Sequence, residues 1–293
     1  QFQGRGLAGA VATDQAHALT GLDRQVGLAQ DEALHKKVLL IGLDGVRVDI
    51  MARVETPVRI RDLGATLLDL AGIGAADLDY YFGNPGDAPF TGDFDSDGID
   101  TIGLYRESAG LTYSRNTHTQ GIADFEFFFG NPGDLPIVGD FDGNGRDTVS
   151  IYRPSNQTIY VINQLGSNDA GLGVADHSFM FGNPGDVPFV GDFDGDGVET
   201  VGLHRESTGF FYYRESLTTG IADGQFYFGD PGDRFIAGDW GYVDGADTPG
   251  LFRPSNRTLY LRYTLTQGNA DLDFTWSDAG PAWRPVAGNF ALN

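Results

Sequence analysis

The stretch "FGNPGDVPFVGDFDGDGVET", residues 181–200, decides the fold because the chain repeats it. Its first six residues, or the variant "FGDPGD", recur with spacings of 47, 52 and 47 residues. The four copies begin at Phe82, Phe129, Phe181 and Phe228. A weaker fifth copy begins at Phe274, 46 residues after the fourth. Self-similarity at a fixed period of roughly 20–50 residues is the signature of a repeat architecture, so one unit predicts the whole.

Each repeat unit holds four short apolar segments separated by Gly, Asp and Pro, which is the pattern of β-strands and turns. In the third unit the predicted strands cover residues 188–193, 200–205, 210–215 and 224–229. Four complete sets follow one another, preceded by a lone fourth-type strand at 78–83 and followed by a lone first-type strand at 285–290. Antiparallel units of this length are typical of propeller blades. We expect an all-β fold, a small β-propeller of four to five four-stranded blades, with a short α/β N-terminal segment. Five complete blades would need strands from that segment.

The composition changes near residue 76, where we place a domain boundary. Residues 1–76 carry 8 Lys+Arg and 9 Asp+Glu, a net charge of −1, and the whole chain has −22, which leaves −21 for residues 77–293. We predict a linker or helical segment at 1–35, a second segment at 36–76 and the propeller, with repeats of about 47 residues, at 77–293. So acidic a surface repels nucleic acid and anionic lipid and suits cations. No apolar run reaches the length of a membrane span, and the absence of cysteine excludes disulfides.

An acidic turn joins the first and second predicted strands of each unit. In the third unit it places Asp192, Asp194 and Asp196 at positions 1, 3 and 5, followed by Gly197. A tight loop turns alternate side chains inward, so these oxygens converge, and the carbonyl at position 7 can join them. Ca²⁺ takes 6–8 hard oxygen ligands at about 2.3–2.6 Å, whereas zinc prefers His or Cys. The alternative is a simple hairpin turn, but carboxylates that converge without a cation repel one another.

We therefore predict Ca²⁺ as the cofactor of these turns. The fourth turn has one extra residue and lacks the second aspartate. The candidate ligands, at positions 1, 3, 5, 7 and 8, are Asp93, Asp95, Asp97, Ile99 and Asp100; Asp140, Asp142, Asn144, Arg146 and Asp147; Asp192, Asp194, Asp196, Val198 and Glu199; and Asp239, Asp244 and Asp247.

The units resemble FG-GAP or VCBS-type repeats, as in the propeller of the integrin alpha chain and in many bacterial surface proteins. The resemblance rests on "FGNPGD", "GDFDGDG" and the apolar strand that follows, and it covers residues 77–293. It implies that Ca²⁺ lies between the first two strands of a blade. The family places its last carboxylate at position 9, where this chain has Thr, and here the acid stands at position 8. Either that acid reaches the ion differently, or a threonine oxygen or water replaces it. We expect weak, extracellular-type affinity, about 10⁻⁴–10⁻³ M.

The segment before the repeats has a pattern of its own. Residues 36–50, "KKVLLIGLDGVRVDI", predict a buried strand that ends at an acidic turn, and residues 61–74, "RDLGATLLDLAGIG", predict a helix. These pieces resemble the start and the closing part of the alkaline phosphatase superfamily, in its phosphodiesterase branch, which implies a metal-ligand role for Asp44. The family has several hundred residues between them, including the nucleophile. One carboxylate cannot hold a catalytic metal pair, so we predict a truncated remnant with no catalytic residues.

Arginines recur at the end of the second predicted strand, and tyrosines recur on the third. They are Arg106, Arg153, Arg205 and Arg253, and Tyr113, Tyr160, Tyr212, Tyr213 and Tyr260. The arginines either contact a sugar or an anion or pair with a neighbouring Asp, and we favour the pair. The tyrosines either stack on sugars or pack between blades. His204 replaces the aromatic residue found at its place in the other units, which indicates a packing role.

The sequence favours a non-enzymatic, calcium-binding propeller that serves as a binding or adhesion module. We expect it outside the cell or at the surface of a bacterium, with an extracellular protein or glycan as partner and no contact with nucleic acid or membrane. Two other functions stay open. A lectin-like, carbohydrate-binding propeller would bind on a glycan array. The chain could also be a metal-dependent phosphodiesterase with the propeller as its accessory domain, in which case it would hydrolyse a bis-phosphoester when zinc is added.

Overall fold

The chain divides into two compact units, residues 1–35 and residues 36–293. The computed structural model describes residues 37–43, 47–51, 78–84, 86–166, 170–240, 245–276 and 284–290, all within the second unit. The predicted segment 1–35, the predicted helix over 61–74 and Asp44 lie outside the described residues.

The described strands form five sheets, which we number as blades 1 to 5. Blade 1 consists of β4 (Ala88–Gly92), β5 (Thr101–Arg106), β6 (Leu111–Ser114) and β7 (Phe125–Phe128), with the short β11 (Ala170–Gly171) parallel to β7. Blade 2 consists of β8 (Leu135–Gly139), β9 (Thr148–Arg153), β10 (Thr158–Val161) and β12 (His177–Met180). Blade 3 consists of β13 (Asp186–Gly191), β14 (Thr200–Arg205), β15 (Phe210–Tyr213) and β16 (Gly224–Tyr227). Blade 4 consists of β17 (Arg234–Gly238), β18 (Thr248–Arg253), β19 (Thr258–Leu261) and β20 (Leu272–Thr275).

Blade 5 combines strands from both parts of the sequence. It consists of β21 (Arg284–Gly288), β1 (Lys37–Leu43), β2 (Arg47–Met51) and β3 (Leu78–Tyr81). Strand β1 pairs antiparallel with β21, from Lys37 opposite Gly288 to Ile41 opposite Arg284. The two strands left over from the repeats, β3 and β21, therefore join β1 and β2 in one sheet. The second unit thus has five blades, and strands of the 36–76 segment complete the fifth.

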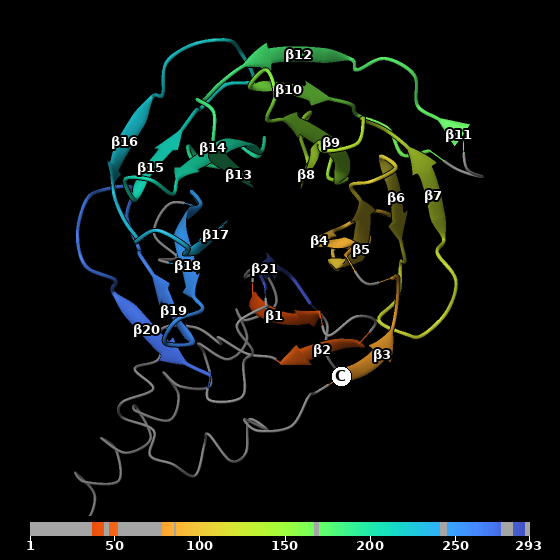
Figure 1. Cartoon of the computed structure of the whole chain (residues 1–293), viewed down its shortest axis with the longest axis horizontal. Helices are drawn as coiled ribbons and strands as arrows, with labels where there is room; N and C mark the ends of the chain where they lie inside the picture. Colours follow the sequence, from red (N-terminus) through yellow and green to blue (C-terminus); the bar gives the residue numbers. More distant parts are fainter. Residues whose placement is uncertain are drawn as a thin grey trace, which may run out of the picture. The chain divides into compact units, whose positions relative to one another are not determined.

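The blades are arranged around a common axis, with the first strand of each blade innermost and the fourth outermost (Figure 1). The five first strands line a cavity of about 200 Å³ on the axis. Strand β8, for example, contributes Pro136, Ile137 and Val138 to its wall. The predicted all-β propeller is confirmed.

The hydrophobic core lies between neighbouring blades rather than within one sheet. Phe90 and Tyr105 of blade 1 pack with Val149 and Ile151 of blade 2, and all four are at most 7% exposed. In blades 1 to 4 the first five residues of the second strand are buried, because neighbouring blades cover that strand on both faces. These strands are β5, β9, β14 and β18. A continuous buried run is what a sheet stacked on two others requires. Each fully buried aliphatic or aromatic side chain contributes about 1.5–3 kcal/mol to the free energy of unfolding.

In blades 1 to 4 the second strand ends in an arginine that pairs with the aspartate of the preceding "PGD" turn. In blade 2, Arg153 donates to Asp134 from Nε (2.8 Å) and from Nη2 (2.7 Å), and Asp134 is buried. The guanidinium of Arg153 lies 4.5 Å from the ring centroid of Tyr160. The equivalent sets are Arg106, Asp87 and Tyr113; Arg205, Asp186 and Tyr212; and Arg253, Asp233 and Tyr260. The predicted arginine–aspartate pair is confirmed, and a guanidinium covers one face of each of these tyrosines.

Candidate metal loops and the contacts between blades

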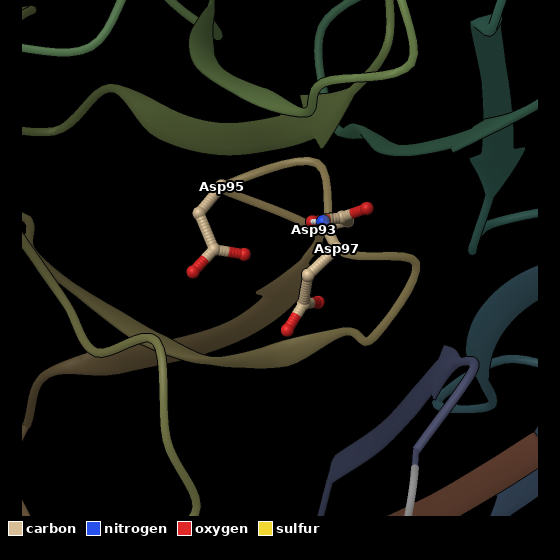
Figure 2. A group of neighbouring side chains, drawn as sticks. All are labelled: Asp93, Asp95 and Asp97. Carbon is tan, nitrogen blue, oxygen red and sulfur yellow. Dashed lines mark hydrogen bonds between the residues drawn. The ribbon is translucent and has the colours of Figure 1, made fainter.

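The predicted metal ligands lie in the loops that join the first and second strands of blades 1 to 4. We call them acidic loops 1 to 4; they cover residues 93–101, 140–148, 192–200 and 239–248. In loop 1 the three aspartates come together, since one carboxylate oxygen each of Asp93, Asp95 and Asp97 lie within 4.8 Å of one another. The carboxylates of Asp95 and Asp97 are directed to the same side of the loop (Figure 2). Loop 3 brings Asp192, Asp194 and Asp196 together in the same way.

Hydrogen bonds within the loop hold the aspartates in place. In loop 1 the carboxylate of Asp93 accepts from the backbone N–H groups of Asp97 (3.1 Å) and Gly98 (2.8 Å). The carboxylate of Asp97 accepts from the N–H of Ile99 (2.9 Å). Gly98 has φ +83°, a conformation that residues with a side chain rarely adopt. The glycine after the third acid thus permits the turn, and the acids satisfy the backbone donors that the turn exposes.

Loops 2 and 3 repeat this network. In loop 2, Asp140 accepts from Asn144 N–H (3.0 Å) and Gly145 N–H (2.7 Å), so an asparagine at position 5 preserves the backbone path. In loop 3, Asp192 accepts from the N–H groups of Asp196 (3.1 Å) and Gly197 (2.9 Å). In loop 4 the candidate ligands Asp239 and Asp247 are described, whereas Asp244 lies outside the described residues.

The electrostatics of the loops suit a cation. Desolvation, followed by the charges of Asp97 and Asp93, raises the pKa of Asp95 above its ordinary value. Desolvation and the charge of Asp196 likewise raise the pKa of Asp194. Both shifts mean that, without a cation, the ionised form of these carboxylates is less stable than that of an isolated aspartate. Oxygens about 2.3–2.6 Å from Ca²⁺ lie at most about 5 Å from one another, so carboxylates within 4.8 Å can share one such ion.

The acid at position 8 makes a contact between blades. In loop 2 the N–H of Asp147 donates to the carbonyl of Asp93 in loop 1 (2.9 Å), and the N–H of Asp93 donates to Oδ2 of Asp147 (2.8 Å). We call this reciprocal pair the interblade clamp. It recurs between Glu199 and Asp140, between Asp247 and Asp192, and between Asp100 and Asn289 of blade 5. The position-8 carboxylates thus accept hydrogen bonds from the position-1 residue of the preceding blade.

Glycine before position 1 makes room for the clamp. A Cβ on Gly92 would lie 3.0 Å from Cβ of Asp147, and one on Gly139 would lie 2.2 Å from Oε2 of Glu199. The threonine at position 9 is also engaged: in loop 3 the hydroxyl of Thr200 donates to the carbonyls of Gly191 (3.3 Å) and Arg214 (2.7 Å). The sequence signal for the interblade clamp is the recurrent "GD" dipeptide, whose aspartate stands at position 1. From this dipeptide the sequence predicts the acidic loop but not the clamp.

His204 packs in the core, as predicted. Its ring stacks on Phe235 of blade 4, with 4.0 Å between the ring centroids and 22° between the planes. It is 1% exposed, and burial lowers its pKa to about 4. The ring is therefore neutral at physiological pH and serves as an aromatic surface between blades 3 and 4.

Comparison with known proteins identifies no family and two partly similar structures. No protein-family model and no curated protein matches the sequence. Two solved structures are similar to it in part, both crystals of BBS1N in complex with ARL6DN. The one soaked with lead is 8% identical, with a TM-score of 0.39 over 68% of this chain and 57% of that chain. The one soaked with mercury is 9% identical, with a TM-score of 0.32 over 59% and 50%. The chain thus spans about half the length of these structures. Among the described residues, no helix is long and apolar enough to cross a membrane.

Proposed function

We propose that this protein is a calcium-stabilised propeller of the FG-GAP or VCBS type that acts as a binding module outside the cell. The observation that carries the proposal is the convergence of three carboxylates, within 4.8 Å, at the same place in blades 1 and 3. Loop 2 has the same backbone network, so we include it with asparagine as its third ligand. The ligands at positions 1, 3 and 5 are oxygens, which Ca²⁺ prefers.

The proposed role of the ion is to stiffen the first turn of each blade. An ion that binds only the folded state stabilises it by about 2.7 kcal/mol per site at a concentration 100-fold above the dissociation constant. It also offsets the desolvation and the neighbouring negative charges that raise the pKa values of Asp95 and Asp194. The loops are exposed, so we propose weak sites, which fill only where calcium is abundant, about 10⁻⁴–10⁻³ M. We therefore propose that the module works outside the cell.

The partner we propose is an extracellular protein or glycan, and we assign the module no catalytic step. Its rigid blades present loops at both edges of each sheet, and loops on a rigid scaffold are where proteins carry binding surfaces.

The test is thermal unfolding of the protein in calcium and in EDTA. We expect a melting temperature several degrees higher in calcium, because the ion binds the native loops. Asp97→Asn and Asp196→Asn should each reduce that difference. Asp273→Asn is the matched control, since it removes the same charge from an exposed position on the outer strand of blade 4 and should leave the difference unchanged. A melting temperature that is equal in calcium and EDTA would refute the proposal.

A further inference from the structure

Three exposed aliphatic side chains occupy one equivalent position in blades 1, 2 and 3. Ile122, Val174 and Ile221 are 87%, 87% and 88% exposed, against 54% for Met180, the next large apolar side chain in the described part of the chain. Each lies in the loop that joins the third and fourth strands, within the motif Gly-aliphatic-Ala-Asp. We call these the outer loops. Single exposed apolar residues are common on protein surfaces, but the same position repeated three times is a pattern.

In blades 1 and 3 an arginine holds the outer loop, and the aliphatic residue does not. In blade 1, Nη1 of Arg115 donates to the carbonyl of Ile122, and its Nη2 donates to the hydroxyls of Thr117 and Thr119 (3.0 Å each). A Cβ on Gly121 would lie 2.2 Å from Arg115, so glycine is needed for this approach. The loop is thus fixed by an arginine bound to its backbone and hydroxyl groups.

Blade 4 shows that a polar residue fits the same loop. There Arg262 donates from Nη1 to the carbonyl of Asn269 (3.1 Å), as Arg214 donates to the carbonyl of Ile221 in blade 3. The alanine that follows packs inward in both cases, Ala270 and Ala222 lying against the core of the preceding blade. Since asparagine occupies the exposed position without changing these contacts, the fold does not need an aliphatic residue there.

The three side chains share one edge of the ring with the acidic loops. In a four-stranded antiparallel meander, the first and third connections leave the same edge of the sheet. Blades 1 to 3 are consecutive around the axis (Figure 1), and because the blades repeat one topology, equivalent loops leave the same edge of each. Acidic loops 1 and 3 add exposed carboxylates to that edge, including Asp95 and Asp194. One bound Ca²⁺ per three carboxylates would still leave each cluster negative.

We propose that this edge of blades 1 to 3 binds a basic polypeptide that has apolar sockets among its lysines and arginines. The proposal rests on the binding role proposed above and names the chemistry of the partner. The negative edge attracts a cationic surface, and the aliphatic side chains enter its sockets. A second copy of this chain, with a formal net charge of −22, and an anionic membrane would both bring like charge to the same edge.

The test uses a synthetic amphipathic helix of leucine and lysine as the probe and measures its binding to the full chain in calcium by fluorescence anisotropy. The variant Ile122→Asn/Val174→Asn/Ile221→Asn copies the residue found in blade 4 and leaves the charge unchanged. We expect it to bind the probe about 40-fold more weakly or worse, if each side chain gives half the value of full burial. Polylysine, which has no leucine or other apolar residue, should bind both proteins equally.

Equal binding of the leucine–lysine probe by both proteins, or no binding by the wild type, overturns the inference. So does a wild type that binds phosphatidylserine vesicles, or forms dimers in sedimentation, through the three side chains instead. The calcium-dependent rise in melting temperature is measured on the same variant and should be retained. Loss of probe binding with that rise intact supports the inference. Absence of the rise in the wild type refutes the calcium proposal and leaves the binding result standing.

Discussion

The interblade clamp makes a prediction that separates a structural acid from a metal ligand. Asp147→Ala removes the carboxylate that accepts from the N–H of Asp93 and leaves that partly buried donor without its acceptor. A hydrogen bond to a charged group contributes about 1.5–3 kcal/mol to the free energy of unfolding. For a domain of this size, each kcal/mol shifts the melting temperature by about 2–4 °C, so we expect a decrease of roughly 3–12 °C.

The assay is calorimetry of wild type and variant in calcium and in EDTA. Asp147→Ala should lower the melting temperature by the same amount in calcium and in EDTA, because the clamp is a backbone-to-side-chain hydrogen bond that does not involve the ion. Asp147→Asn, which keeps an oxygen acceptor, should lose less than Asp147→Ala. In contrast, Asp97→Asn should lower the melting temperature chiefly in calcium. The reasoning is wrong if Asp147→Ala abolishes the calcium-dependent rise, since Asp147 would then be a ligand.

Three further predictions concern single side chains. Asp95→Asn should lower the melting temperature in calcium, where a ligand is lost. In EDTA it should leave the melting temperature unchanged or raise it, because desolvation and two neighbouring aspartates already raise the pKa of Asp95. Scanning fluorimetry in both buffers measures the two effects, and a decrease in EDTA would count against this reasoning. His204→Phe should remove a loss of stability on acidification. Its pKa of about 4 lies below the unfolded value near 6.5, so the native protein loses up to about 3 kcal/mol of stability as pH falls through that window; urea unfolding from pH 7 to 4 should show a steeper decline for the wild type than for the variant. Asp186→Ala should lower the free energy of unfolding by about 3–5 kcal/mol, because it leaves the charge of the Arg205 guanidinium without its partner. Adding Arg205→Met should recover part of this loss in chemical unfolding. A double variant as unstable as the single one would contradict the prediction.

The blade pattern could be predicted from the sequence because it depends on local alternation and on turn residues that repeat. The pairing of Arg205 with an aspartate was also predictable, since both recur at fixed places in each unit. The clamp was not, because Asp147 and Asp93 lie 54 residues apart and their contact depends on how one blade stacks on the next. The same holds for blade 5, whose strands β1 and β21 carry no repeat motif in common and meet only through the closure of the ring.

The metal loops show the same division. The spacing of Asp93, Asp95 and Asp97 predicts that the loop turns their side chains together, and the structure brings their oxygens within 4.8 Å. The exposed position of Ile122 could not be inferred, because an isoleucine between glycine and alanine reads equally well as core. In the structure its side chain is 87% exposed, and its carbonyl accepts from Arg115.

The pairing of β1 with β21 has a consequence for the order of folding. Their paired residues stand about 250 positions apart, so in a flexible chain joining them costs about 5 kcal/mol of entropy, a few kcal/mol more than closing a local hairpin. On the ribosome, blades 1 to 4 emerge complete one after another, while β1 waits for β21. Contacts so distant in sequence slow folding, and we expect blade 5 to be the last blade to assemble and the first to open under load.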